Sequence, residues 1–196
     1  MLENYCNAFY HRYFLLPLLK RVNQYCSPIF FTILSALLGF LILPALFFHQ
    51  PIIAVFLLLG SGYCDTIDGA LARYSDKTSP FGAALDITVD RLVEFFCIMG
   101  FWLIDQSRSG YCLLMLGSIL ICVTSFLVVG VFTQNNSHKS FHYSPGLMER
   151  AEAFIFFTLI LMLPEQFNIL ALLFSILVFW TALWRLIEFY RALSHS

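Results

Sequence analysis

Long apolar stretches alternate with short polar segments along the chain from about residue 28 onward. The apolar stretches have lengths near the roughly 20 residues that a helix needs to cross a bilayer. Pro, Gly, Asp, Asn and Ser gather between them, as is typical of turns. The pattern predicts six transmembrane helices, at Pro28–Phe48, Ile52–Tyr74, Phe81–Ile104, Tyr111–Phe132, Leu147–Leu163 and Phe167–Tyr190.

The first 24 residues have a different pattern, because apolar positions there mix with the cations Arg12, Lys20 and Arg21. Such a mixture is typical of an amphipathic helix that lies in the membrane interface. We therefore expect an interfacial segment at 1–24 and one six-helix membrane domain at 25–196. The predicted fold class is all-α integral membrane.

Composition agrees with lipid as the solvent. Of the 196 residues, 60% are hydrophobic and 12% are charged, whereas about a quarter of the residues in a soluble domain are charged. The six cysteines include no CxxC pair, so we expect thiols that pack as small apolar side chains. The chain has no basic stripe, and a nucleic-acid partner is therefore not expected.

The basic residues predict an orientation. Ten of the eleven Lys and Arg residues fall on one side of the predicted helices or in the helix halves next to it, and only Arg108 is left for the other side. Loops rich in Lys and Arg stay on the cytoplasmic side of a membrane. We expect both termini to be cytoplasmic, with the acidic residues described next near that side.

Four carboxylates lie inside the second and third predicted helices. Asp65 and Asp68 are three residues apart, and Asp86 and Asp90 are four apart, so each pair shares one helix face. Since a short loop joins the two helices, they must be antiparallel. At 1.5 Å per residue, both pairs then lie roughly 6–12 Å below the cytoplasmic helix ends. Acids in such segments are candidates for a functional site, because an uncompensated charge in hydrocarbon is costly.

Four carboxylates at this spacing cannot all stay ionised and unpaired. Either some are protonated, as in a proton relay, or divalent cations are bound. Carboxylate oxygens suit Mg²⁺ or Mn²⁺. Two such ions would balance four carboxylates, and two-metal sites typically catalyse phosphoryl displacement.

Nearby, Gly69 and Ala72 allow close approach of a ligand or helix. Gly82 brings backbone N–H groups to a phosphate, and Arg73 can bind a diphosphate.

These residues form the run Asp65-x2-Asp68-Gly69-x2-Ala72-Arg73-x8-Gly82-x3-Asp86-x3-Asp90, which resembles the complete signature of the CDP-alcohol phosphatidyltransferase family. The resemblance implies six transmembrane helices, usually in a homodimer, that transfer a phosphatidyl group from CDP-diacylglycerol to an alcohol and release CMP. It implies that the four acids hold two Mg²⁺ or Mn²⁺ ions and that Asp90 is also the general base. It places Gly69, Ala72, Arg73 and Gly82 in the CDP pocket.

Family members often begin the first helix with Pro-Asn/Asp-x-x-Thr, where this chain has Pro28-Ile29-Phe30-Phe31-Thr32. Thr32 is therefore expected to contact CDP, whereas the Ile29 side chain cannot form a hydrogen bond. Arg150 matches the arginine that binds the acceptor phosphate in the inositol-phosphate and glycerophosphate transferases, and Lys139 is a second acceptor-binding candidate. The expected acceptor is a phosphorylated polyol such as glycerol 3-phosphate or inositol phosphate.

Several alternatives remain open at this point. The acceptor can instead be a neutral alcohol, namely inositol, serine or choline. A non-catalytic relative would bind the nucleotide lipid without turnover, although the intact Asp90 argues against it. An ion-coupled transporter predicts inverted repeats or broken helices, and the sequence has no repeat. An aspartate-rich prenyltransferase needs two separate acidic motifs and more helices.

Overall fold

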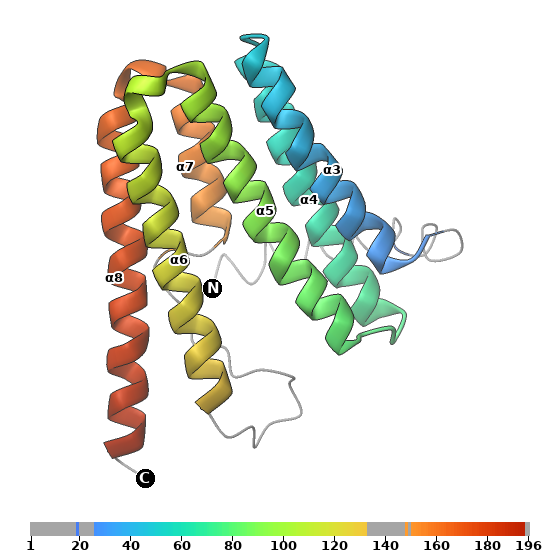
Figure 1. Ribbon diagram of the computed structural model, residues 1–196. Helices are drawn as coiled ribbons and strands as arrows, with labels where there is room; N and C mark the ends of the chain where they lie inside the picture. The colour runs from blue at the N-terminus through green and yellow to red at the C-terminus, as the bar shows by residue number, and fades with distance from the viewer. Residues whose placement is uncertain (1–18, 20–25, 133–147, 149, 195–196) are drawn as a thin grey trace, which may run out of the picture. The chain divides into compact units, whose positions relative to one another are not determined.

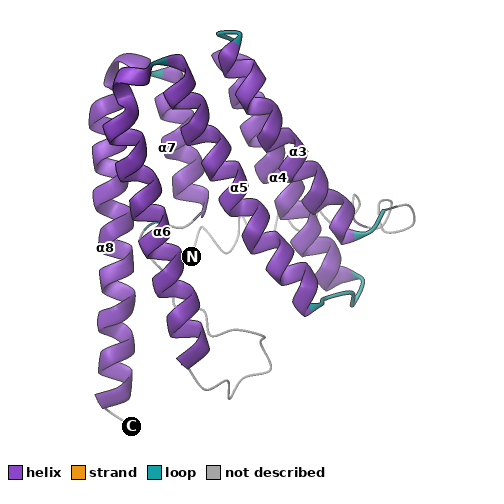
Figure 2. Ribbon diagram, in the orientation of Figure 1, coloured by secondary structure: helices purple, strands orange, loops and turns teal. Residues whose placement is uncertain are grey.

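The computed structural model describes residues 19, 26–132, 148 and 150–194, and the regular structure in these ranges is helical (Figures 1 and 2). The six long helices are α3 (Pro28–Phe47), α4 (Pro51–Tyr74), α5 (Pro80–Ile104), α6 (Ser109–Phe132), α7 (Arg150–Met162) and α8 (Phe167–Ser194). Two single turns of 3₁₀ helix, η2 (Gln106–Arg108) and η3 (Pro164–Gln166), precede α6 and α8. All six predicted helices are present. The expected interfacial helix at 1–24 lies outside the described residues, except for Leu19.

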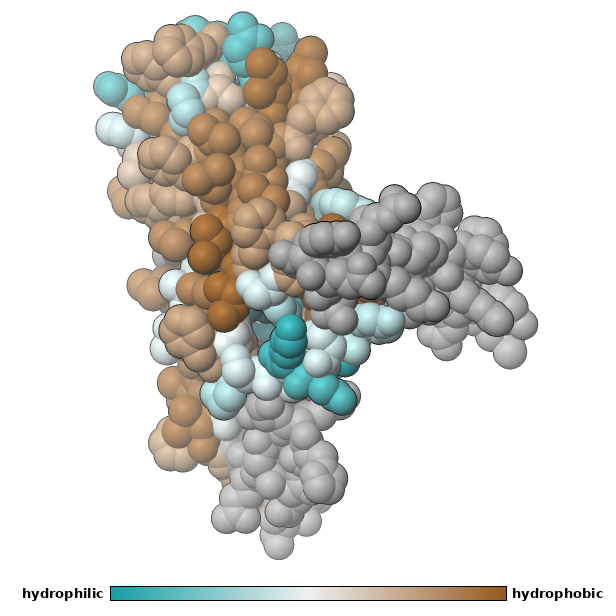
Figure 3. Space-filling model, turned by 90° about the vertical axis from the view of Figure 1, so that its right-hand side faces the viewer, coloured by the Kyte–Doolittle hydropathy of each residue, from teal (hydrophilic) through white to brown (hydrophobic). Residues whose placement is uncertain are grey.

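Four helical segments are long and apolar enough to cross a membrane: Pro28–Phe47, Pro51–Tyr74, Gln106–Phe132 and Pro164–Ser194. Only 28% to 39% of the residues in these spans are buried in the protein, so most of their apolar side chains are left for lipid. Hydrophobic residues accordingly cover much of the surface that Figure 3 shows. The integral membrane class is confirmed. α5 carries the charged residues Asp86, Asp90, Arg91 and Glu94, and the crossing of α5 and α7 stays a prediction.

The described chain forms two compact units. The first contains the residues up to Leu41 together with Leu57–Glu94, and the second contains Ile42–Phe56 together with the residues from Phe95 onward. The first unit therefore holds most of α3, the C-terminal part of α4 and the N-terminal part of α5. The second holds α6, α7 and α8 with the remaining ends of the earlier helices.

Small residues set the packing of the first unit. The Ser35 hydroxyl of α3 donates to the backbone carbonyl of Ser61 of α4 at 3.0 Å, and the two serine Oγ atoms are 2.9 Å apart. A Cβ atom added at Gly39 of α3 would lie 2.7 Å from Cγ2 of Val93 of α5. These helices pack closely because the contact positions carry small residues, glycine and serine.

Aromatic and cationic side chains organise the second unit, where α6 packs along α8. The Phe101 ring lies 6.0 Å from Phe157 and 5.9 Å from Phe167, both edge to face. Arg108 donates to the carbonyl of Pro164 at 3.1 Å and forms an ion pair with Asp105 at 3.2 Å. The hydrogen bond joins the α5–α6 turn to the α7–α8 turn, and the ion pair holds Arg108 within the α5–α6 turn. Hydrogen bonds from Ser107, with a smaller contribution from Arg108, lower the pKa of Asp105 below its ordinary value.

Candidate metal and nucleotide site

Local backbone chemistry at the α4–α5 turn positions the site. The hydroxyl of Ser75 donates to the Leu71 carbonyl at 2.7 Å, and the Lys77 N–H donates to the Ala72 carbonyl at 3.0 Å. Between these two residues Asp76 adopts a left-handed conformation, with φ of 52°. This combination satisfies the last carbonyls of α4 and ends the helix. α5 then begins at Pro80, a residue that suits the first position of a helix.

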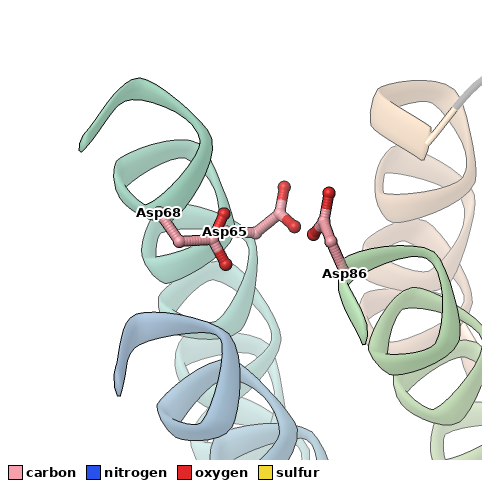
Figure 4. A group of neighbouring side chains, drawn as sticks. All are labelled: Asp65, Asp68 and Asp86. Atoms are coloured by element: carbon pink, nitrogen blue, oxygen red, sulfur yellow. The ribbon is translucent and has the colours of Figure 1, made fainter. Parts of the chain in front are cut away.

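Three of the four predicted carboxylates meet in this unit. Asp65 and Asp68 project from α4 and Asp86 from α5, and one oxygen of each lies within 4.8 Å of the others. Figure 4 shows the carboxyl groups of the two helices turned toward one another. Asp68 is buried at 4% exposure, while Asp65 and Asp86 are half-buried. Such an arrangement of like charges requires a cation or protons to be stable.

The geometry and chemistry of the group fit a hard divalent cation. Oxygen ligands lie about 2.0–2.1 Å from Mg²⁺ in octahedral geometry, so neighbouring and opposite ligands are roughly 3–4 Å apart. Oxygens within 4.8 Å of one another reach these separations through small side-chain rotations. The set contains carboxylate oxygens only, which favours Mg²⁺ or Mn²⁺ over softer metals.

Asp90 lies one turn beyond Asp86 on α5, is half-buried and stands outside the three-carboxylate group. Glu94 follows one turn later and is 3% exposed. The Glu94 carboxylate forms an ion pair with the guanidinium of Arg91, with Nη1 and Oε2 2.7 Å apart. This pair offsets part of the cost of the buried charge of Glu94 within α5.

A cavity of about 310 Å³ adjoins the carboxylates within the same unit. Its lining includes Asp68 and Asp86 and all the residues expected to contact CDP, namely Thr32, Gly69, Ala72, Arg73 and Gly82. The guanidinium of Arg73 folds back over Gly69. A Cβ atom added at Gly69 would lie only 3.4 Å from Nη1 of Arg73. The absence of a side chain at Gly69 thus leaves space where Arg73 and a ligand can approach α4.

Gly82 lies at the start of α5, where a side chain of the preceding turn caps the helix. Its backbone N–H donates to Oγ of Ser79 at 3.0 Å, so Ser79 caps α5. The N–H of Ala83 likewise donates to the Ser79 carbonyl at 3.0 Å. The cap gives the Gly82 N–H a partner in this structure, and contact of Gly82 with CDP stays a prediction. Gly82 also lines the cavity.

Thr32 and Ile29 of α3 both line the cavity. The Thr32 side chain is buried, and its hydroxyl donates to the Pro28 carbonyl one turn earlier at 3.4 Å. This bond is long, and the hydroxyl oxygen keeps its capacity to accept a hydrogen bond. Ile29 adds an apolar side chain, 37% exposed, to the same wall.

Of the two acceptor-binding candidates, only Arg150 is among the described residues, and it lies in the other unit. Lys139 lies outside the described residues. Arg150 begins α7 in the second unit, where its guanidinium carbon lies 5.3 Å from the centre of the Phe154 ring.

Arg185 of α8 is a buried cation that the sequence analysis did not single out. It is 8% exposed, and its Nη1 donates to the Cys122 carbonyl of α6 at 3.2 Å. Its guanidinium carbon lies 5.2 Å from the centre of the Phe126 ring. The sequence signal was present, because an arginine within an apolar helix of membrane-spanning length is itself a functional-site candidate.

Helices of membrane-spanning length together with a three-carboxylate group define a membrane protein with a candidate divalent-metal centre. Comparisons with known proteins identify its family: the sequence model of the CDP-alcohol phosphatidyltransferases matches residues 25–187. The chain belongs to the CDP-alcohol phosphatidyltransferase family.

Two curated relatives match about half of the chain. The archaetidylinositol phosphate synthase of Methanothermobacter thermautotrophicus is 33% identical over 99 residues, which are 50% of this chain and 47% of the relative. The phosphatidylinositol phosphate synthase of Corynebacterium glutamicum is 30% identical over 93 residues, 46% of this chain and 42% of the relative. The matched stretch thus spans less than half the length of each relative.

Solved structures share the fold over nearly the whole chain. A structure of phosphatidylinositol phosphate synthase from Mycobacterium tuberculosis with CDP-DAG bound superposes with a TM-score of 0.74 at 19% identity. It covers 90% of this chain and 94% of that one. A second structure of the same enzyme, in complex with manganese and citrate, gives a TM-score of 0.75 over 89% of this chain and 88% of that one, also at 19% identity.

Proposed function

We propose that this protein transfers a phosphatidyl group from CDP-diacylglycerol to a hydroxyl of a small phosphorylated polyol and releases CMP. The observation that carries the proposal is the meeting of Asp65, Asp68 and Asp86 beside a cavity that Arg73 also lines. Family membership supports phosphatidyl transfer. The names of the two curated synthases support an acceptor such as inositol phosphate.

The cavity residues bind and orient the nucleotide lipid. Arg73 supplies planar N–H donors that suit the oxygens of a diphosphate, and it lines the same cavity as Asp68 and Asp86. The chemistry that Mg²⁺ or Mn²⁺ supplies, when bound by Asp65, Asp68 and Asp86, is neutralisation of charge on the diphosphate and on the leaving phosphate. The family signature supports two ions, with Asp90 contributing to their binding.

Asp90 is proposed to act as the general base. Its carboxylate accepts the proton of the acceptor hydroxyl while that oxygen forms a bond to the phosphorus carrying the diacylglycerol. The bond from this phosphorus to the bridging oxygen breaks, and the electron pair leaves with CMP. Proton transfer to a positioned carboxylate contributes about 10²–10⁴-fold to such a rate. The place of Asp90 outside the three-carboxylate group supports a role besides metal binding.

Cations outside the cavity are proposed to bind the phosphate of the acceptor. Arg150 is supported by its match to the acceptor-binding arginine of related transferases, and Lys139 by its place in the longest predicted cytoplasmic loop. Arg185 joins them as a candidate because its buried guanidinium lies beside a carbonyl and an aromatic ring. An anionic ligand would stabilise the buried arginine, because it would compensate the charge that burial removes from water.

The proposal includes a topology. α5 and α7 are expected to cross the bilayer with the four apolar helices, which makes six spans. Both termini and the carboxylate site are expected to face the cytoplasm, where CDP-lipids and polyol phosphates meet. The strong bias of Lys and Arg to one side supports this orientation. A homodimer is expected from the family resemblance.

The decisive experiment measures CMP release by purified protein with CDP-diacylglycerol and Mg²⁺ or Mn²⁺. Glycerol 3-phosphate, inositol phosphate, inositol, serine and choline are supplied one at a time. We expect turnover with a phosphorylated polyol, and turnover with a neutral alcohol alone would correct the acceptor class. No turnover with any of the five would favour a non-catalytic relative.

The base role of Asp90 has its own test. Asp90→Asn is expected to retain binding of the CDP-lipid but to lose about 10²–10⁴-fold in kcat. Titration calorimetry with CDP and initial rates of CMP release separate the two effects. A rate close to that of the wild type would remove Asp90 from the base role.

A further inference from the structure

The cavity contains a second cation that does not belong to the eight signature positions. Lys77 lines it together with Thr78 and Ser79, at the end formed by the α4–α5 turn. Its side chain is exposed, and among the described residues no ion pair involves its ammonium group. Lys77 is therefore available to an anionic ligand in a cavity that Arg73 also lines.

The turn places Lys77 by backbone hydrogen bonding. The N–H of Lys77 donates to the Ala72 carbonyl at 3.0 Å, which returns the chain over the last turn of α4. The left-handed conformation of Asp76, with φ of 52°, makes this return possible. The backbone of Lys77 is thus held at the cavity, whereas its side chain keeps the freedom to reach a ligand.

The order of charges along α4 assigns the two cations to different parts of a ligand. The backbone of Arg73 lies five residues after Asp68, about 7.5 Å farther along the helix axis, and its guanidinium folds back over Gly69 toward the carboxylates. Lys77 follows the end of α4 at Tyr74 and lines the cavity at the α4–α5 turn. In the proposed reaction the transferred phosphate must lie near the carboxylates. The phosphate that stays with the nucleoside must then lie toward the turn.

We propose that Lys77 binds the phosphate that leaves with the nucleoside, so that Arg73 and Lys77 each bind one phosphate of the CDP-lipid. This inference rests on the proposed function. An ammonium group there forms charge-assisted hydrogen bonds to a nucleoside monophosphate. Lys77 then contributes to recognition of the substrate and to retention of the leaving CMP.

The test compares the binding of CMP, CDP and cytidine to the purified full chain in detergent with Mn²⁺. Lys77→Ala is expected to weaken CMP about tenfold and to leave cytidine unchanged, because cytidine lacks the phosphate. Lys77→Arg keeps the charge and is expected to bind CMP within about twofold of the wild type. Arg191→Ala removes an exposed cation from the last turn of α8 and serves as the matched control.

The outcomes separate this inference from the proposed function. Unchanged CMP binding in Lys77→Ala, or an equal loss of CMP and cytidine binding, overturns the assignment of Lys77. Weaker CDP binding in Arg73→Ala, seen together with either result, leaves the proposed function in place. If the wild type does not bind CDP and Arg73→Ala changes nothing, the proposed function fails as well.

Discussion

Asp68→Asn is expected to have opposite effects on the metal-free and metal-bound protein. Asp68 is 4% exposed, and its carboxylate lies within 4.8 Å of the carboxylates of Asp65 and Asp86. Two unit charges 4.8 Å apart repel each other by about 3.5 kcal/mol at an effective dielectric constant near 20. The substitution removes two such repulsions while keeping the size of the side chain.

The net gain is smaller than this sum, because Asp65 and Asp86 are half-buried and solvent screens the repulsion. We expect Asp68→Asn to raise the free energy of unfolding of the metal-free protein by about 1–2 kcal/mol. Metal binding changes in the other direction. A cation at 100 times its Kd stabilises the wild type by about 2.7 kcal/mol, and a 100-fold weaker Kd leaves about 0.4 kcal/mol at the same concentration.

The assay is thermal unfolding in detergent, with a chelator or with saturating MnCl₂. The variant is expected to have a higher Tm than the wild type without metal and a smaller rise in Tm on addition of Mn²⁺. Glu165→Gln, which removes an exposed acid in the second unit, is expected to behave as the wild type in both conditions. A variant that is less stable without metal and keeps the full Mn²⁺ response would refute the reasoning.

Three further predictions follow from particular contacts. Arg150→Ala is expected to raise the KM for a phosphorylated acceptor about 10–100-fold through the loss of charge-assisted hydrogen bonds, and an unchanged KM in steady-state kinetics would indicate a neutral alcohol. Gly39→Ala places a methyl group 2.7 Å from Cγ2 of Val93 and is expected to cost about 1–3 kcal/mol. The Gly39→Ala, Val93→Ala pair should recover much of the lost Tm. The lowered pKa of Asp105 means that the stabilisation from its ionised form is complete above its unfolded-state pKa and is lost as the pH falls through the lowered value. Asp105→Asn should flatten that part of the Tm-against-pH curve, and an unchanged curve would contradict the assignment.

The helices and the acidic pairs were accessible from sequence because both depend on local spacing. Apolar stretches of membrane-spanning length predict helices wherever they occur, and the six predicted helices differ from the observed ones by at most four residues at any end, as at Tyr190 against Ser194. Aspartates three and four residues apart share a helix face in any helix. The signature therefore identified the family before any packing was known.

Other features depended on hydrogen bonds that spacing alone does not reveal. The capping of the Gly82 N–H by Ser79 is one example, because a hydroxyl three residues earlier can compete for the same donor. The ion pair of Glu94 with Arg91 is another. In both positions a neighbouring side chain decides whether a group remains available to a ligand.

By itself the sequence determined the helical membrane class, the pairing of acids on two helix faces and the family, since each follows from the order and spacing of residues. Only the tertiary structure decided which side chains converge: Asp65, Asp68 and Asp86 form one group, while Asp90 stands outside it. It also decided that Arg185 is buried against α6 and that Lys77 lines the cavity. The physical reason is that convergence depends on how helices approach and which rotamers their side chains adopt, and neither is encoded in the periodicity of a single helix.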